Sequence, residues 1–417
     1  MLRQPRPSRE IGSKRPSGAA GWCAALLGVL LVAACGGEAA YPQSTIHPQS
    51  DFAEAIHSLY VSIFWWTMLI LAVVWTVLAY VLVKFRGKEG DPKPRQIRGH
   101  MGLEIGWTIG PALIVMAIVV PTIQAVFATQ RPLSDDALIV HVTGHRFWWQ
   151  FEYPEQGVST ANELRLPLGR PVSLRLEARD VVHSFWIPAL GGKRDLAPEP
   201  ALREGEGEPG YTWIHFTPTV AGTYLGQCAE FCGESHAFMG LRAVVAAEAD
   251  FQAWLERWLA GAVTASDAET PAPPDSAGLA VTQVAPQAPA PPPAQPPLPV
   301  AAQEDPLVAA GRTAFLTQST CVACHAINGT TAQGRVGPNL TLFGARGSIG
   351  AGRLPNTPEN LARWIRDPQS VKPGAEMPGT QAMMQIPRGR DQMYSWPATG
   401  LSEEQVTAVA AFLSSLR

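Results

Sequence analysis

The sequence predicts a membrane protein of several domains: a two-helix transmembrane hairpin, then a small β-sandwich, then a compact all-α domain. Three observations predict it: two uncharged apolar runs, a region of short β-branched segments punctuated by Gly and Pro, and a C-terminal region of helical periodicity. The length of 417 residues fits two or three domains. The formal net charge of −3 offers no basic field for nucleic acid, so we expect no nucleic-acid partner.

Residues 1–34 resemble a secretory signal, because a basic stretch precedes an apolar run that is too short to span a membrane. The run ends in Val-Ala-Ala-Cys35, which resembles a bacterial lipoprotein cleavage box and predicts an acylated Cys35. Ordinary cleavage nearby, or an uncleaved anchor, are the alternatives. Residues 35–60 would then form an external N-terminal segment.

Residues 61–128 are predicted to form the transmembrane hairpin. The runs 61–83 and 105–128 carry no charge and are long enough to cross a bilayer. The segment between them is rich in Lys and Arg, and positively charged loops remain in the cytoplasm. Everything after residue 128 is therefore expected on the external side, in an oxidising compartment.

The β-domain is expected over 129–260. Its clearest strands and a closing helix are the runs 137–142, 172–176, 241–245 and 251–259. Residues 261–303 are mostly Ala, Pro and Gln, a composition that cannot bury a core and is typical of an extended linker.

Residues 304–417 are predicted to form a helical domain around a haem. Cys321, Cys324 and His325 form the Cys-x-x-Cys-His attachment pattern of c-type haem, with the two thiols as thioether donors and His325 as an axial iron ligand. A helix is expected before this motif, another over 361–366, and a closing helix over 406–416 that a capping box introduces at 402–405.

The sixth iron ligand is expected to be a methionine, which raises the reduction potential of a haem. Met377 is the candidate because Pro follows it, as in c-type cytochromes. Met383, Met384 and Met393 are its competitors.

A second group of soft ligands lies in the β-domain. Cys228, Cys232, His236 and Met239 fall within twelve residues, and His183 lies on an earlier predicted strand. Two thiolates can bridge two copper ions, each of which then takes one histidine, while Met239 and the carbonyl of Glu230 supply weak axial contacts. A disulfide between the cysteines, a structural zinc site and a core role for His183 are the alternatives.

The runs 183–188 and 226–239 closely resemble subunit II of haem-copper cytochrome c oxidases. The resemblance covers about residues 50–260, and it implies a cupredoxin-like β-sandwich with a dinuclear copper centre A. Its implied metal ligands are His183, Cys228, Glu230 (through its carbonyl), Cys232, His236 and Met239. With the C-terminal motif, taken as an all-α class I cytochrome c domain, the layout resembles that of caa-type oxidases.

The resemblance also implies roles for two acids. The side chain of Glu230 would bind Mg at the contact with subunit I, and Glu104 would stand at the entrance of a proton path. A solvated acid at a helix end is the alternative for Glu104, although a buried carboxylate at a membrane boundary is a functional candidate by default.

Two departures from the family pattern stand out. Phe147 occupies a position where many members have Trp for receiving electrons, and Trp148 follows it. The route by which electrons reach the copper is therefore open, and packing is an equal alternative for Trp148. After Asp195 the family often has Pro-Gly-Arg, whereas this chain reads Leu-Ala-Pro-Glu-Pro-Ala and then has an acidic loop over 204–208. This departure puts the polar contacts with subunit I in doubt, and a solvated face or a docking surface for a basic partner are the alternatives for the loop.

The resemblance implies the electron-input subunit of a terminal cytochrome c oxidase. Electrons would pass from a soluble or membrane-bound cytochrome c, or from the bc complex, through haem c and copper to subunit I, where oxygen is reduced and protons are pumped. Subunits I and III are the implied partners, in a bacterial inner membrane with the copper and haem domains on the periplasmic side. The alternative is the same module serving a copper-containing nitric oxide reductase, and a non-enzymatic redox carrier is a third possibility.

Overall fold

The computed structural model describes residues 43–87, 90, 92, 96, 98–130, 134–198, 211–261, 304–381, 384–388 and 392–417. Several predictions lie outside these residues: the signal over 1–34, acylation of Cys35, the acidic loop over 204–208, nearly all of the 261–303 linker, and Met383.

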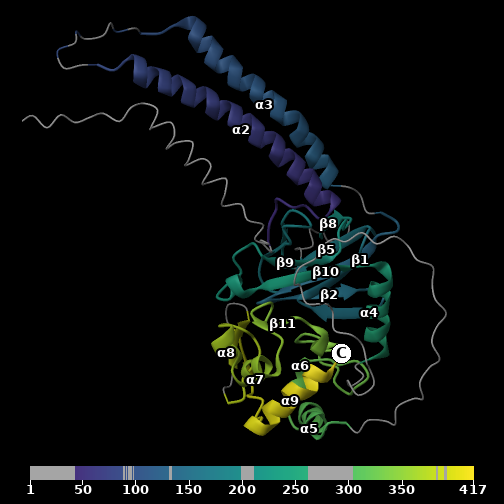
Figure 1. The fold of residues 1–417 in the computed structure, drawn as a ribbon. Helices are drawn as coiled ribbons and strands as arrows, with labels where there is room; N and C mark the ends of the chain where they lie inside the picture. Colours follow the sequence, from purple (N-terminus) through teal and green to yellow (C-terminus); the bar gives the residue numbers. More distant parts are fainter. Residues whose placement is uncertain are drawn as a thin grey trace, which may run out of the picture. The chain divides into compact units, whose positions relative to one another are not determined.

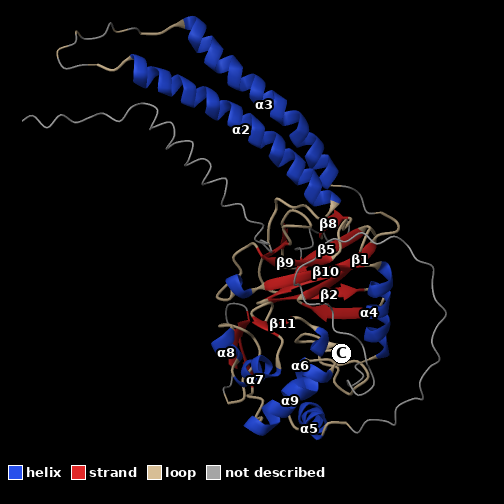
Figure 2. Ribbon diagram, viewed as in Figure 1, coloured by secondary structure: helices blue, strands red, loops and turns tan. Residues whose placement is uncertain are grey.

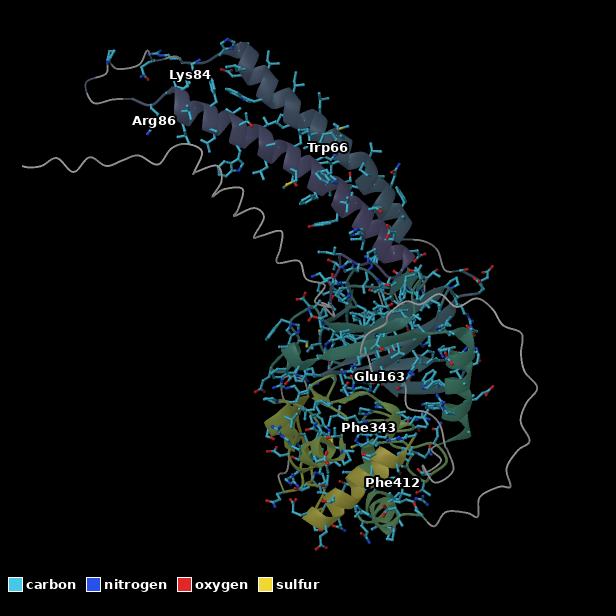
Figure 3. All side chains as sticks on the ribbon, in the orientation of Figure 1. Trp66, Lys84, Arg86, Glu163, Phe343 and Phe412 are labelled. Atoms are coloured by element: carbon cyan, nitrogen blue, oxygen red, sulfur yellow. The ribbon has the colours of Figure 1, made fainter. Side chains whose placement is uncertain are left out.

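The two predicted spans are confirmed as long apolar helices, α2 (Asp51–Lys84) and α3 (Met101–Thr129). Helix α2 begins ahead of its apolar run because the Ser50 side chain caps it by accepting from the backbone N–H of Ala53. Lys84 and Arg86 lie at the far end of the hairpin from the β-domain (Figure 3). That placement agrees with the basic connecting segment being cytoplasmic.

The β-domain is a sandwich of two five-stranded sheets, as predicted (Figures 1 and 2). One sheet has the order β3-β2-β1-β5-β8 and the other β4-β10-β9-β6-β7. Each contains one parallel pair, β1 with β5 and β4 with β10. The strands are β1 (Leu138–His145), β2 (Trp148–Tyr153), β3 (Val158–Ala161), β4 (Glu163–Pro167), β5 (Val172–Ala178), β6 (His183–Trp186), β7 (Arg194–Leu196), β8 (Thr212–Phe216), β9 (Gly222–Cys228) and β10 (Gly240–Ala246).

Buried residues alternate with more exposed ones along the strands, and the buried ones form the core of the sandwich. In β2, Trp149, Phe151 and Tyr153 are fully buried while the residues between them are half-buried. The helix α4 (Glu248–Ala260) closes one side of the sandwich by placing Phe251 and Trp254 against Tyr153. This framework makes the strand ends next to the copper-ligand residues rigid.

The C-terminal domain is mainly helical, with a separate core that includes Phe343 and Phe412 (Figure 3). Its helices are α5 (Pro306–Thr317), α6 (Cys321–Cys324), α7 (Pro358–Arg366), α8 (Pro368–Val371) and α9 (Glu403–Ser415). The predicted capping box is present, since Ser402 and Gln405 each cap the other's backbone N–H.

The prediction of an all-α domain is confirmed for its helices and core, and the domain also contains two small two-stranded ladders. A hairpin joins β13 (Met384–Arg388) to β14 (Gln392–Trp396), and a short ladder joins β11 (Ser348–Ile349) to β12 (Leu354–Pro355). Each ladder has only two strands, too few to form a sheet with a core of its own. The core of this domain therefore remains a helical one.

Candidate metal centre and haem site

Neighbouring strands bring the proposed copper ligands together. His183 is the first residue of β6 and Cys228 the last residue of β9, and the register pairs Phe185 with Cys228. We call residues 229–239 the copper loop. It turns back at once, because the backbone N–H of Cys228 donates to the carbonyl of Met239 at 3.0 Å. The predicted ligands thus form one cluster.

The distances show which groups lie next to each other. The two sulfurs of Cys228 and Cys232 are 3.9 Å apart. His183 Nδ1 lies 3.9 Å from the Cys228 sulfur, whereas His236 Nδ1 lies 3.7 Å from the Cys232 sulfur. The Met239 sulfur is 3.8 Å from that of Cys232, and the Glu230 carbonyl is 3.2 Å from the Cys228 sulfur. Each histidine therefore accompanies a different cysteine.

This geometry suits a shared metal pair better than a disulfide. A disulfide needs its sulfurs about 2.05 Å apart, and here they are 3.9 Å apart with both cysteines free. A metal–thiolate bond is about 2.3 Å, the value for zinc, so an ion on either side of the sulfur pair can reach both sulfurs. The donor set is soft and has one imidazole for each ion, as copper prefers.

A carboxylate that the sequence reasoning missed holds His183 in place. Asp180 Oδ1 lies 2.8 Å from His183 Nε2, which leaves Nδ1 facing Cys228. Burial opposes ionisation of Asp180, but hydrogen bonds from His183 and from the backbone N–H groups of Arg146 and Val181 outweigh it and lower its pKa. The available signal was an acid three residues before a ligand histidine, the pattern of a carboxylate–histidine–metal arrangement.

The two thiols form a coupled pair. The hydrogen bond between the two thiols lowers the pKa of Cys228, while the same bond and burial raise the pKa of Cys232. One of the two buried sulfurs is thus favoured as a thiolate. Metal binding would take both as thiolates and release the remaining proton.

Aromatic side chains surround the cluster. Trp149 is fully buried, packs edge-on to His183 at 6.0 Å and donates from Nε1 to the carbonyl of Met239 at 3.3 Å. Trp148, which the sequence left open between electron transfer and packing, instead stacks on His145 at 4.1 Å. Phe147 is buried, and its ring lies against Gly233 of the copper loop.

The haem motif is arranged for iron binding. Cys321 and Cys324 form the short helix α6, and His325 ends it. His325 Nδ1 donates to the carbonyl of Pro338 at 2.8 Å, so Nε2 is the nitrogen that would bind iron. Burial lowers the pKa of His325, which keeps the imidazole neutral and able to act as a ligand.

Met377, the predicted sixth ligand, is partly buried and packs against the core of the haem domain. Met384 and Met393 lie on the hairpin strands β13 and β14. The haem motif and Met377 therefore belong to one domain.

The two remaining predicted acids lie in different surroundings. Glu104 is in the first turn of α3, where its Oε1 accepts from the backbone N–H of His100 at 3.1 Å. The Glu104 side chain thus helps to cap the helix. An acidic group in the first turn also interacts favourably with the positive end of the helix dipole. Glu230 is exposed beside Cys228, with Phe231, which is 77% exposed, next to it.

Three family models match the chain in order. They are the cytochrome c oxidase subunit II transmembrane domain over 43–125, the cytochrome c oxidase subunit II periplasmic domain over 156–247, and cytochrome c over 308–417. Together they cover all three of the predicted parts.

Relatives named cytochrome c oxidase subunit 2 match most of the length of this chain. Cytochrome c oxidase subunit 2 of Alkalihalophilus pseudofirmus is 34% identical over 84% of this chain and 83% of its own length. The same subunit of Bacillus sp. strain PS3 is 32% identical over 80% of each chain. Among solved structures, the periplasmic domain of cytochrome oxidase subunit II from Bradyrhizobium japonicum matches 30% of this chain and 94% of its own, with 28% identity and a TM-score of 0.26.

Proposed function

The chain belongs to the cytochrome c oxidase subunit II family, in the form with a copper site and a fused cytochrome c domain, and from this premise we propose how its residues carry electrons. The haem site of this chain would hold a haem c that can accept electrons from a soluble or membrane-bound cytochrome c, or from the bc complex. The copper ligands would hold a metal pair that connects this haem with the haem of subunit I. Subunit I then reduces oxygen to water and pumps protons, with subunit III completing the complex.

The proposed copper ligands are His183, Cys228, the carbonyl of Glu230, Cys232, His236 and Met239. The single observation that carries the proposal is the pairing of each histidine with a different sulfur, 3.7–3.9 Å away, around a sulfur pair 3.9 Å apart. When bound, the copper pair supplies a one-electron carrier whose charge change is shared between two ions. His183 and Cys228 lie at strand ends, and the other proposed ligands lie on the copper loop that follows β9.

The proposed haem groups are Cys321 and Cys324 as thioether donors, with His325 and Met377 as axial iron ligands. The Pro338 carbonyl fixes the tautomer of His325, and burial keeps the imidazole neutral. A Met ligand would raise the reduction potential of the haem. That suits a carrier that must accept electrons from another cytochrome.

The surface next to the copper ligands is the candidate docking surface for subunit I. A cavity of about 550 Å³ lies beside Cys228 and His236 and is also lined by Ile56 at the start of α2. Exposed Phe231 and Glu230 adjoin it along the copper loop. Subunit I would cover this face, with Mg held in part by the Glu230 side chain.

Two further points complete the proposal. The copper and haem domains lie on the periplasmic side of a bacterial cell membrane, because the basic segment between α2 and α3 faces the cytoplasm. The Glu104 side chain marks the entrance of a proton path into subunit I, a role that its place at the start of a membrane helix supports.

The copper-to-haem ratio of the purified complex tests the ligand set, after allowing for the metals of subunit I. Two coppers per haem c on this chain are expected. One copper would indicate a blue-type site and no bridged pair. Zinc, or a disulfide between Cys228 and Cys232, would overturn the electron path through this domain.

A nitric oxide reductase with the same module is the alternative. The subunits that copurify with the chain discriminate between the two, as does the gas that the complex reduces. Oxygen consumption with cytochrome c as donor supports the oxidase, and nitric oxide reduction alone would replace it.

A further inference from the structure

The haem domain touches the copper loop at residues next to the proposed ligands. The backbone N–H of Gly240, which follows Met239, donates to the carbonyl of Ala351 at 3.0 Å. The Arg353 guanidinium lies over the ring of Phe238 at 4.1 Å, and the hydroxyl of Ser235 donates to the carbonyl of Pro373. Two segments of the haem domain, 350–353 and 372–376, therefore contact this loop.

Lys372 is the one described lysine that is buried, with 2% of its surface exposed. Its Nζ donates to the carbonyl of Phe147 in the copper domain and to the carbonyl of Gly350 in its own domain, the latter at 3.2 Å. Burial lowers the pKa of Lys372 to about 7. Charged or neutral, the amine keeps at least two N–H groups, so it can serve both carbonyls.

Phe147 lies between the copper loop and the segment of the haem domain that leads to Met377. Its ring lies against Gly233, which follows Cys232, and also against Gly374 in the segment that leads to Met377. A Cβ added at either glycine would lie about 3.1–3.2 Å from the ring, so both backbones approach it as closely as glycine allows. Lys372 donates to the backbone carbonyl of Phe147.

We propose that Lys372 is a positioning residue for electron transfer between haem c and copper: it fixes the segment leading to Met377 against Phe147 and hence against the copper loop. The inference rests on the ligands proposed above, since it needs Met377 and Cys232 at the two sites. Lys372 itself carries no electron and touches neither metal. Its contribution is to keep the two carriers at a short and constant separation.

Two contacts away from Lys372 also join the haem domain to the copper domain. Glu163, buried in the copper domain (labelled in Figure 3), accepts from the backbone N–H of Gly347 at 2.7 Å. Leu342 of the haem domain is buried in the apolar cluster of the sandwich. We expect these contacts to keep the domains together when Lys372 is replaced. The variant therefore tests how the segment leading to Met377 is positioned against the copper loop, with the fold of both domains intact.

The test uses the whole oxidase with Lys372→Met, which keeps the length of the side chain and removes its donors. Electron transfer from haem c to copper is timed after rapid photoreduction of the haem, and both midpoint potentials are measured. Loss of hydrogen bonds to a buried amine should weaken the fixed arrangement and slow transfer about tenfold, at unchanged potentials. Arg363→Met, which removes an exposed charge from the same domain, is the matched control and should transfer at the wild-type rate.

Each outcome decides the question. A rate within about twofold of wild type in a Lys372→Met enzyme with full haem and copper would overturn the role, and so would a change in potential large enough to explain the slower rate. A wild-type enzyme without two coppers would instead overturn the ligand set, which the same metal analysis reveals. The two failures are therefore distinguishable.

Amine labelling of the wild-type enzyme provides a second test that requires no variant to fold. A lysine with a lowered pKa reacts faster than an ordinary one if the reagent reaches it, so protection of Lys372 can only mean burial. We expect labelling of Lys372 to be about tenfold slower than that of a lysine in a short unfolded peptide, a ratio that corresponds to about 1.4 kcal/mol. Equal labelling would contradict the interface.

Discussion

Asp180 controls the copper centre without binding it, because it fixes the orientation of His183 through a 2.8 Å hydrogen bond. Replacement of such a partner typically costs 10–100-fold in metal affinity. We expect Asp180→Ala to lower copper occupancy by about this factor at limiting copper. Asp180→Asn keeps an acceptor and should retain copper, with a raised copper potential because a negative charge is lost.

Copper content and potentiometry of both Asp180 variants check this prediction. Glu155→Gln, an exposed acid in a turn of the same domain, is the control and should leave both quantities unchanged. Full copper affinity in Asp180→Ala would mean that the strands alone orient His183.

Met377 determines the haem potential if it is the sixth ligand. Met377→Leu removes the sulfur but keeps a side chain of similar volume, so the thioether bonds to Cys321 and Cys324 should form as before. We expect the potential to fall by on the order of 0.1 V, within the ~0.8 V range that axial ligands span. Redox titration measures it, and a fall in Met384→Leu instead would transfer the ligand role to Met384.

At the scale of helices, α5 and α9 cross at a glycine. A Cβ on Gly311 would lie 1.9 Å from the carbonyl oxygen of Ala408, far inside contact distance. Helix propensity alone predicts that Gly311→Ala stabilises by about 1 kcal/mol, whereas forcing the helices apart costs about 1–3 kcal/mol or more. We therefore expect net destabilisation of the haem domain and less attached haem.

Thermal unfolding followed at the haem band, together with the haem content, checks the Gly311 prediction. Because propensity and packing act in opposite directions, a raised melting temperature would show that the two helices separate easily at this crossing.

Two substitutions of Glu104, in the first turn of α3, separate its role as a helix cap from its proposed role at the entrance of a proton path. Glu104→Gln keeps an oxygen for the His100 N–H but cannot ionise, whereas Glu104→Ala loses both functions. We expect both variants to lower oxygen turnover about tenfold or more, and only Ala to cost about 1 kcal/mol in helix stability. Normal turnover in Glu104→Gln would leave Glu104 as a cap alone.

The elements differed in how readily the sequence predicted them. Long apolar runs predicted α2 and α3, and alternation predicted β1, β5 and β10, since each signal is local. The hairpin β13–β14 was missed because its short strands lie within a region read as helical. Ligand spacing predicted the copper cluster, but Asp180 and Lys372 act through contacts that only the folded chain creates.

For the molecule as a whole, the copper and haem domains have separate cores that share one interface. Among the residues that the structure describes, Leu342 is the one haem-domain side chain in the sandwich core, where it lies with Trp254 and Trp258 of α4. Burial of a leucine contributes about 1.5–3 kcal/mol, a small part of what a core of this size supplies. The copper domain should therefore fold and bind copper without the haem domain.

A chain that ends after Gly261 tests this independence and the serial order of the two sites. In the assembled oxidase we expect it to keep two coppers and to turn over with a small reductant that reaches copper directly, because the copper loop is then uncovered. Turnover with cytochrome c should fall at least about tenfold, since a tethered haem acts at an effective concentration near millimolar and its loss leaves only diffusive encounter. Oxygen consumption with the two donors measures the ratio. Unchanged turnover with cytochrome c would mean that electrons can enter at the copper without passing through haem c, and missing copper would mean that the sandwich depends on its contact with the haem domain.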